Sequence, residues 1–505
     1  MVSVDEMRAL EAAAFAAGVS EADLQQRAAT AVAEEVARLV APGERVAVLV
    51  GHGNNGRDGM LAGMWLAERQ RQVEVVLAPR HGVTEAEQTR LRELGARVVD
   101  AEATSEVLPS ARVAVDALAG IGTRGALREP LASLARKVNE VSGERGDAVQ
   151  VVAVDVPSGI DADTGDVPGE VVWADCTVTL GAVKQGLLRF PGAERVGRLA
   201  ARAIGIPQAA LASLPFDVLD EHALADAVPH RPASAHKYRF GRVLVVAGSD
   251  YFLGAPVLCA GGAARAGAGL VTLASTAAVR QAVAAYLPEI TYAQAELDAQ
   301  RLRPYLESHA VLVVGPGLGR ESSTVRFVHD LLRLRREVAR PGQALVVDAD
   351  GLYALSELQE WWAELGPNAL ITPHAGELAR LIGGQPTEDT TDWARTRRLA
   401  VRWGCYLIAK GPFTCIAGPD GQVAVWPRAN SALATGGTGD VLAGLVGGLL
   451  AQGAAVWDAA RVGVAAHALS AAHIVETHGW RTLLASDLLP EIPAALARLA
   501  STQRR

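Results

Sequence analysis

A glycine-rich segment near the C-terminal end carries the residue types best suited to chemistry. Residues 430–440 are small and polar, end in Asp440, and are followed by an apolar run that predicts a helix. Glycines let backbone N–H groups approach a ligand closely, and a helix N-terminus favours phosphate. A carboxylate would repel that anion unless it takes a proton from a hydroxyl group, so we interpret Asp440 as a general base. Stabilisation of the first helical turn is the alternative role.

Five predicted strands of the C-terminal half end in glycine-rich or polar turns. Parallel strands present their carboxyl ends at one edge of a sheet, so these turns predict one crevice for a ligand. His374, Glu377 and Lys410 would each be ordinary structural or surface residues if they stood alone. Together at one edge they favour a nucleotide and phosphate site. The turns are residues 248–249, 315–319, 348–351, 372–377 and 410–414.

The N-terminal half carries a second set of candidate residues. Residues 51–59 follow a predicted strand and precede a helix, and they contain the pair Asn54-Asn55, whose amides can bind a ligand or a monovalent cation. Asp116 and Asp155 each end another predicted strand. A lone aspartate there is usually a turn former, but two beside an Asn-Asn loop favour a site.

The elements that must position these residues alternate between strands and helices along both halves of the chain. Short β-branched runs such as Arg45–Val50 and Arg242–Val246 predict buried parallel strands, with amphipathic helices between them. A polar, proline-containing passage between Ile206 and Arg242 separates the two series. We therefore expect an α/β protein with two tandem three-layer domains, Rossmann-like at residues 1–215 and ribokinase-like at residues 216–505.

Composition narrows the class of protein. The 505 residues are 50% hydrophobic and carry a formal net charge of -8, which argues against a general nucleic-acid binder. No secretory signal or membrane span is apparent, and four dispersed cysteines make a disulfide framework or zinc site unexpected. We expect a soluble cytoplasmic protein with small-molecule substrates and no membrane partner.

The first domain resembles the NAD(P)H-hydrate epimerase family. The resemblance lies in the Asn-Asn-Gly-x-Asp-Gly segment, the turn after Asp116 and the Asp-Val-Pro-Ser-Gly turn that begins at Asp155. It implies potassium binding by Asn55, Asp116 and Ser158, with Asp155 placed catalytically against the reacting ring. Arg57 departs from the family, which usually has glycine there, and so can obstruct or assist binding of the substrate tail. The implied substrate contacts are Asn54, Asn55, Gly56, Arg57, Asp58, Gly120, Ile121, Gly122, Thr123, Arg124, Gly125, Ala126 and Asp155.

The second domain resembles the ribokinase-like superfamily and, within it, the ADP-dependent NAD(P)H-hydrate dehydratases. Residues 430–440 are the most specific part of a match that runs from His236 to about Leu489. The resemblance implies Asp440 as the base, ADP or ATP as co-substrate, and a magnesium ion that Glu377 helps to organise through water. The implied nucleotide contacts are Lys410, Gly411, Pro412, Phe413, Thr414 and Gly439. The implied substrate contacts are Ala255, Gly317, His374 and Asp440.

Both resemblances together predict a repair enzyme for hydrated NADH and NADPH. One half would interconvert the R and S epimers at C6, and the other would dehydrate the S epimer using ADP, releasing AMP and phosphate. The alternative is a small-molecule kinase of the ribokinase fold with a non-catalytic N-terminal binding domain. The resemblance also leads us to expect a homo-oligomer.

Overall fold

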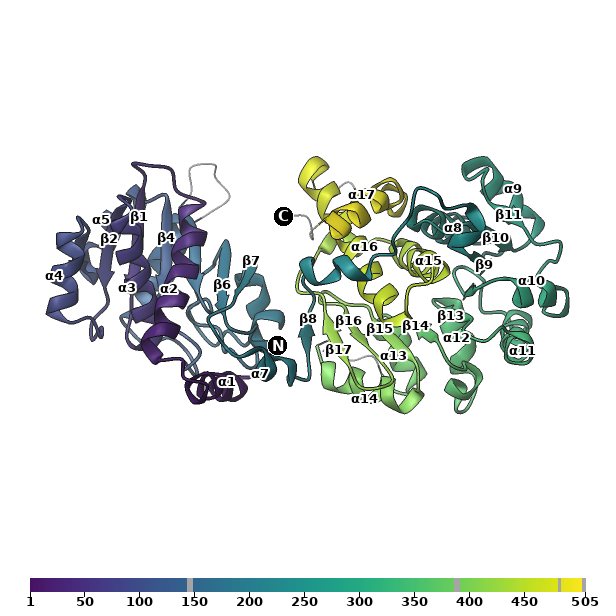
Figure 1. The fold of residues 1–505 in the computed structure, drawn as a ribbon, viewed down its shortest axis with the longest axis horizontal. Coiled ribbons are helices and arrows are strands. Elements are labelled where there is room, and N and C mark those ends of the chain that lie inside the picture. Colours follow the sequence, from purple (N-terminus) through teal and green to yellow (C-terminus); the bar gives the residue numbers. More distant parts are fainter. Residues whose placement is uncertain (143–148, 386–390, 480–482, 502–505) are drawn as a thin grey trace. The chain divides into compact units, whose positions relative to one another are not determined.

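The computed structural model describes residues 1–142, 149–385, 391–479 and 483–501. The chain divides into two compact units, Met1–Phe216 and Asp217–Arg505, and each is built around one large sheet (Figure 1). The expected α/β fold class is confirmed. Among the helices in these ranges, none is long and apolar enough to cross a membrane.

The first unit contains a seven-stranded sheet with the order β3-β2-β1-β4-β5-β6-β7. Every neighbouring pair is parallel, so all carboxyl ends lie at one edge. The chain reverses its direction of strand addition between β1 and β4, which is where such sheets form ligand crevices. The strands are β1 (Arg45–Val50), β2 (Gln72–Leu77), β3 (Arg97–Asp100), β4 (Val113–Ala117), β5 (Gln150–Val154), β6 (Cys176–Leu180) and β7 (Arg198–Arg202).

Helices cover both faces of this sheet. Alternate residues of β1 point to opposite faces, so Val46 and Val48 pack with α1, α2, α3 and α4, whereas Ala47 and Leu49 pack with α5 and α6. Burial on both faces explains why these strands are continuous apolar runs. The helices are α1 (Val4–Ala16), α2 (Glu21–Ala37), α3 (Gly53–Glu68), α4 (Glu85–Glu93), α5 (Thr104–Val107), α6 (Leu131–Val141) and α7 (Gln208–Ala212).

The second unit contains a ten-stranded sheet with the order β11-β10-β9-β12-β13-β14-β15-β16-β17-β8. Its pairs are parallel except for β15 with β16 and β16 with β17. The strands are β8 (Asp217–Val218), β9 (Arg242–Val246), β10 (Leu270–Ala274), β11 (Thr291–Tyr292), β12 (Val311–Val314), β13 (Ala344–Val347), β14 (Ala369–Ile371), β15 (Tyr406–Ala409), β16 (Cys415–Ala417) and β17 (Val423–Val425).

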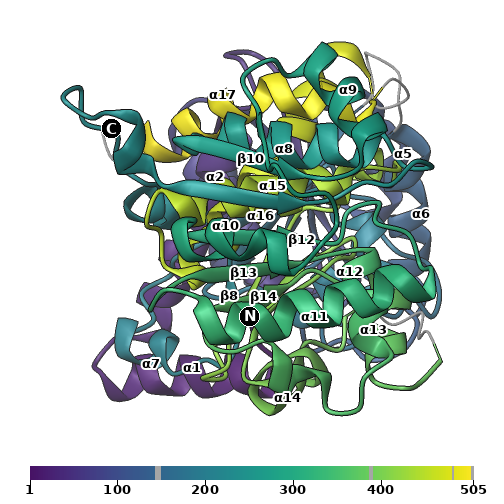
Figure 2. The same ribbon diagram turned by 90° about the vertical axis from the view of Figure 1, so that its right-hand side faces the viewer.

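One face of this second sheet packs against α8, α15, α16 and α17 in a single apolar core. Figure 2 shows α11, α13 and α14 on the other side of the sheet. The helices are α8 (Gly254–Ala266), α9 (Ala277–Tyr286), α10 (Arg303–Ser308), α11 (Ser322–Val338), α12 (Asp350–Ser356), α13 (Ala375–Leu381), α14 (Trp393–Trp403), α15 (Thr438–Ala451), α16 (Val456–His478) and α17 (Leu488–Ser501).

The strand predictions are correct for most buried runs and incomplete at the sheet margins. The short antiparallel strands β16 and β17 lay outside the predicted alternation, as did β6 and β7. The passage predicted as a linker contributes β8, which pairs with β17 through Ala424 and Val425. A two-residue strand has no internal periodicity, so only its distant partner determines it.

Both glycine-rich segments predicted as loops are partly helical. Helix α3 begins at Gly53, so Asn54, Asn55 and Asp58 occupy its first turns. The glycines there allow close packing: a Cβ on Gly56 would lie 2.1 Å from the Gly51 carbonyl oxygen. Helix α15 likewise begins at Thr438, so Asp440 belongs to its first turn rather than to a preceding loop.

Candidate active sites

A cavity of about 700 Å³ lies at the carboxyl edge of the first sheet. Ten of the predicted substrate residues line it: Asn54, Asn55, Asp58, Gly120, Ile121, Gly122, Thr123, Arg124, Ala126 and Asp155. Helix α1 forms another wall with Met7, Arg8, Glu11 and Phe15, which the sequence did not single out. The volume falls within the range of ordinary small-molecule sites.

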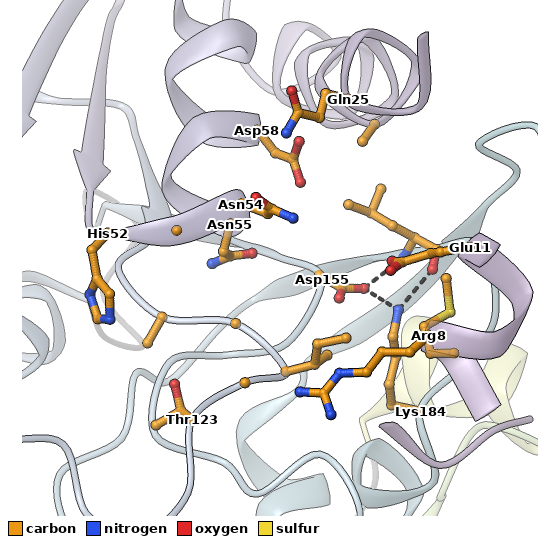
Figure 3. A pocket seen from close by; sticks show the side chains of 18 of the residues that line it. Arg8, Glu11, Gln25, His52, Asn54, Asn55, Asp58, Thr123, Asp155 and Lys184 are labelled. Atoms are coloured by element: carbon orange, nitrogen blue, oxygen red, sulfur yellow. Dashed lines mark hydrogen bonds and ion pairs between the residues drawn. The ribbon is translucent and has the colours of Figure 1, made fainter. Parts of the chain in front are cut away.

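Asp155 directly follows β5 and faces this cavity beside Lys184 (Figure 3). Lys184 Nζ forms an ion pair with Asp155 Oδ1, and the lysine side chain is fully buried. Asp155 has a φ of +64°, a conformation that is uncommon outside glycine. Such strained residues concentrate at functional sites.

Asp58 and Glu11 are among the other carboxyl groups that line the cavity. Asp58 on α3 is 8% exposed, and its Oδ1 has no hydrogen-bond partner among the described residues. Burial, reinforced by the charge of Asp155, raises the pKa of Asp58 well above its ordinary value. Burial also raises the pKa of Glu11, while the charge of Lys184 opposes that rise. A protonated Asp58 can donate a hydrogen bond, which an ionised carboxylate cannot.

Two of the predicted potassium ligands, Asp116 and Ser158, are hydrogen-bonded to each other, and the third, Asn55, lines the cavity. Asp116 is fully buried, and its carboxylate accepts hydrogen bonds from the Ser158 hydroxyl (2.7 Å), the Ser158 amide (2.8 Å) and the Leu118 amide (3.2 Å). Burial raises the pKa of Asp116, which the Ser158 bonds partly offset. No described basic side chain pairs with this carboxylate, so its charge has no cationic partner among the described residues. A hard monovalent cation fits these oxygen-rich surroundings.

Three of the predicted substrate residues do not line the cavity: Gly56, Arg57 and Gly125. The Arg57 side chain instead forms an ion pair with Glu87 at 2.9 Å and donates to Gln25 at 3.0 Å. Gln25 lines the main cavity, but Arg57 does not and instead lines a separate hollow of about 190 Å³. The departure from the family pattern at Arg57 therefore leaves the main cavity open.

The second site gathers charged groups around the start of α15. Lys410 follows β15, and its Nζ lies 2.8 Å from Asp348 Oδ1 and 3.8 Å from Glu377 Oε2. Burial acts to lower the pKa of Lys410, but the charges of Asp348 and Glu377 outweigh it and raise that pKa. A Cβ on Gly439 would lie 3.1 Å from Lys410 Nζ, so glycine is what lets the ammonium lie against the helix N-terminus.

Asp440 projects from the first turn of α15 into the same charged cluster. Burial, followed by the charge of Asp348, raises the pKa of Asp440 to about 7, although Lys410 opposes the shift. A carboxyl group with that pKa exchanges protons near neutral pH, as a general base should. Its elevated pKa favours the chemical interpretation over a purely structural one.

The remaining predicted residues lie on turns and helix starts that follow β9, β12, β14 and β15. His374 caps α13: its ring accepts from the Gly376 and Glu377 amides, and Glu377 accepts from the His374 amide. Gly317 lies against Ala255, since a Cβ there would come within 2.8 Å of the alanine Cβ. The segment Lys410–Thr414 connects β15 to β16 and places Gly411, Pro412 and Phe413 beside Lys410.

Sequence reasoning missed three residues of functional interest: Lys184, Asp348 as a partner of Lys410, and His467. The His467 Nε2 donates to the Thr438 carbonyl oxygen (2.9 Å) in the first turn of α15, and burial lowers the histidine pKa to about 4. Asp348 ends a predicted strand, so its position was a usable signal. Lys184 and His467 offered none, because only the fold brings them to their partners.

Comparison with known proteins places both units in one family. Residues 243–494 match the family model described as NAD(P)H-hydrate dehydratase, and residues 21–186 match the model described as YjeF-related protein N-terminus. A curated protein of Thermofilum pendens, named bifunctional NAD(P)H-hydrate repair enzyme Nnr, is 36% identical over 98% of this chain and 96% of its own length. The chain belongs to the bifunctional NAD(P)H-hydrate repair enzyme family.

Other members and one solved structure agree with this placement. The repair enzyme of the same name from Moorella thermoacetica is 36% identical over 90% of this chain and 88% of its own length. A Bacillus subtilis protein titled ADP/ATP-dependent NAD(P)H-hydrate dehydratase, co-crystallised with ATP and Mg²⁺, is 30% identical. It covers 56% of this chain and 98% of that one, with a TM-score of 0.50. Similarity to the family therefore extends over nearly the whole chain, whereas the solved dehydratase corresponds to about half of it.

Proposed function

We propose that this protein repairs hydrated NADH and NADPH in two steps. The first unit interconverts the R and S epimers at C6, and the second dehydrates the S epimer with ADP as phosphate donor, releasing AMP and phosphate. One observation carries the proposal: a single chain holds two separate carboxylate sites, and its relatives match both units over nearly their full length. A kinase would need no partner domain of the epimerase type, so the kinase alternative is not favoured.

The proposed epimerisation uses Asp155 as a base. C6 of the hydrated ring bears both a hydroxyl group and the ring nitrogen. Asp155 takes the hydroxyl proton, the C6–N bond breaks with its electron pair moving to nitrogen, and a C6 aldehyde forms. Rotation presents the opposite face of the aldehyde to nitrogen, the bond reforms, and the proton returns to oxygen. No atom is gained or lost, so the step requires no external reactant.

The proposed dehydration places Asp440 against the C6 hydroxyl of the S epimer. Asp440 removes the hydroxyl proton while the oxygen attacks the terminal phosphate of ADP, and AMP leaves. The C6–O bond then breaks, phosphate leaves with the electron pair and takes up the C5 proton, and the electrons of the C5–H bond form the C5=C6 double bond of NAD(P)H. The backbone of Gly437 to Gly439 and the Lys410 ammonium offer favourable electrostatics for the charge on the transferring phosphoryl group.

Two ions complete the proposal. A potassium ion held by Asn55, Asp116 and Ser158 would offset the buried carboxylate and anchor the turns that end β4 and β5. A magnesium ion on the nucleotide would neutralise phosphate charge near Asp348 and Glu377. Support for magnesium comes from the Bacillus subtilis dehydratase, whose title names ATP and Mg²⁺.

A spectrophotometric assay tests the dehydratase half. Purified S-hydrate of NADH is mixed with protein, ADP and Mg²⁺, and recovery of the NADH absorbance band is followed alongside AMP release. We expect equal amounts of NADH, AMP and phosphate. Transfer of phosphate to a stable alcohol product, without NADH recovery, would instead support the kinase.

A further inference from the structure

We propose that Lys184 is a positioning residue for epimerisation, which holds one carboxylate oxygen of Asp155 so that only the other faces the substrate. This inference rests on the proposed epimerase function. It assigns a role to a residue that the motifs of the first unit do not include.

Every hydrogen of the Lys184 ammonium group has an acceptor. Nζ pairs with Asp155 Oδ1, donates to the Leu180 carbonyl oxygen at 2.7 Å, and lies 3.4 Å from the Thr179 hydroxyl. An ammonium group has three hydrogens, so this set uses all of them. The lysine side chain is 0% exposed. It is therefore a fixed donor with none left for substrate.

The two oxygens of Asp155 differ completely in their surroundings. Oδ1 accepts from Lys184, from the Leu180 amide at 2.9 Å and from the Thr179 hydroxyl at 3.3 Å. In the described part of the chain, Oδ2 has no hydrogen-bond partner, although the side chain is 13% exposed and lines the cavity (Figure 3). Oδ2 is thus the oxygen available to accept a substrate proton.

The backbone at both residues is also fixed. Asp155 donates its amide to the Val178 carbonyl oxygen at 2.8 Å, and its φ is positive, at +64°. Lys184 pairs with Val2 in a parallel bridge, and the Gln185 amide donates to the Val2 carbonyl oxygen at 2.9 Å. The N-terminal segment therefore helps to hold the lysine beneath the carboxylate.

This arrangement defines what Lys184 contributes to the reaction. Oδ2 takes and returns the proton, while the ammonium balances the carboxylate charge and prevents rotation about the Cβ–Cγ bond. Rotation would exchange the free oxygen for a bonded one and misalign the base. A fixed base contributes mainly to the reaction step, so loss of Lys184 should lower kcat more than it raises KM.

The test compares Lys184→Met with Lys137→Met in the full-length protein. Lys137 lies on α6 outside the cavity lining, which makes its variant a matched control. The R-epimer of hydrated NADH is the substrate, and conversion to S is followed directly by chromatography. We expect kcat to fall about 100-fold or more in Lys184→Met, with KM changed less than about threefold. Lys137→Met should match wild type.

A second comparison separates positioning from general structural support. In an Asp155→Asn background, Lys184→Met should cause no further loss in residual kcat, because its role acts through Asp155. Far-ultraviolet circular dichroism checks folding. If Lys184→Met does not fold, Lys184→Gln replaces it, since the amide keeps a donor for the Leu180 carbonyl and lacks the charge.

Three results would overturn the inference. They are a kcat within threefold of wild type in the folded variant, a pure KM effect, and a large further loss in the Asp155→Asn background. Wild-type protein unable to convert the R-epimer would overturn both this inference and the proposed epimerase. Normal wild-type conversion with an unaffected Lys184 variant would overturn the inference alone.

Discussion

Replacing Asp440 with asparagine should stabilise the second unit while abolishing dehydration. Burial raises the pKa of this carboxyl group from 3.8 to about 7. Native protein thus binds the proton more tightly than the unfolded chain does, and stability falls as pH rises through that window. The cost is complete above pH 7, where the ionised group is held beside Asp348.

The expected magnitude follows from linkage. Each pKa unit corresponds to about 1.4 kcal/mol, so a shift of about three units costs on the order of 4 kcal/mol at pH 8. At pH 5 about 1.2 units of the interval have been crossed, and the cost is about 1.7 kcal/mol. Asparagine has no charge to desolvate, so Asp440→Asn should gain about 2.5 kcal/mol more stability at pH 8 than at pH 5.

Thermal unfolding at pH 5, 6, 7 and 8 measures this difference. The transition of the second unit is identified as the one that shifts when ADP and Mg²⁺ are added. Glu476→Gln, an exposed carboxylate of α16 with no described role in the site, is the control, and its effect should not depend on pH. A stability difference for Asp440→Asn that stays constant or shrinks with rising pH would show that folding does not raise the pKa of Asp440.

Four other outcomes follow from the two sites. Asp155→Ala should leave repair of the S epimer intact and lower R-epimer use at least 100-fold; surviving R-epimer use in an S-depleted assay would remove Asp155 from the mechanism. Arg8→Gln, on the exposed α1 wall, should raise the epimerase KM about three- to tenfold with little change in kcat, which steady-state kinetics can check. Wild-type protein should epimerise faster in potassium than in sodium, and Asp116→Asn should remove this difference. If the variant is still activated by potassium, Asp116 is not a potassium ligand. The dehydratase kcat of wild type should fall about tenfold per pH unit below about 7, because Asp440 must be ionised to act as base; a flat profile down to pH 5 would contradict its assignment.

The sequence predicted those parts of the fold that depend on local pattern. Continuous apolar runs such as Arg45–Val50 and Arg242–Val246 became central parallel strands because both faces of each sheet are covered. The short strand β8 was missed because its pairing partner, β17, lies about two hundred residues away. Glycines near Gly56 were interpreted as loop formers, whereas they permit tight contact between a helix and a strand end.

In the candidate sites, too, the sequence reveals residues in local motifs but not their partners from distant parts of the chain. Asp155 and Asp440 stand at strand ends or helix starts, positions that a motif can reveal. Their chemical states depend on neighbours from elsewhere in the chain: Lys184 comes 29 residues after Asp155, and Asp348 precedes Asp440 by more than ninety. Burial and pairing of this kind cannot be deduced from spacing. The structure therefore adds most where one charged side chain determines the behaviour of another.

If one chain repairs both epimers of hydrated NAD(P)H, it must recover NADH from the R epimer alone. Pure R-epimer of hydrated NADH is incubated with full-length protein, ADP, Mg²⁺ and K⁺, and recovery of the NADH absorbance band is followed against a no-enzyme control. We expect complete recovery with one AMP released per NADH formed, and recovery limited to the spontaneous rate in Asp155→Ala. Recovery from the S epimer only, or none from either, would contradict the account.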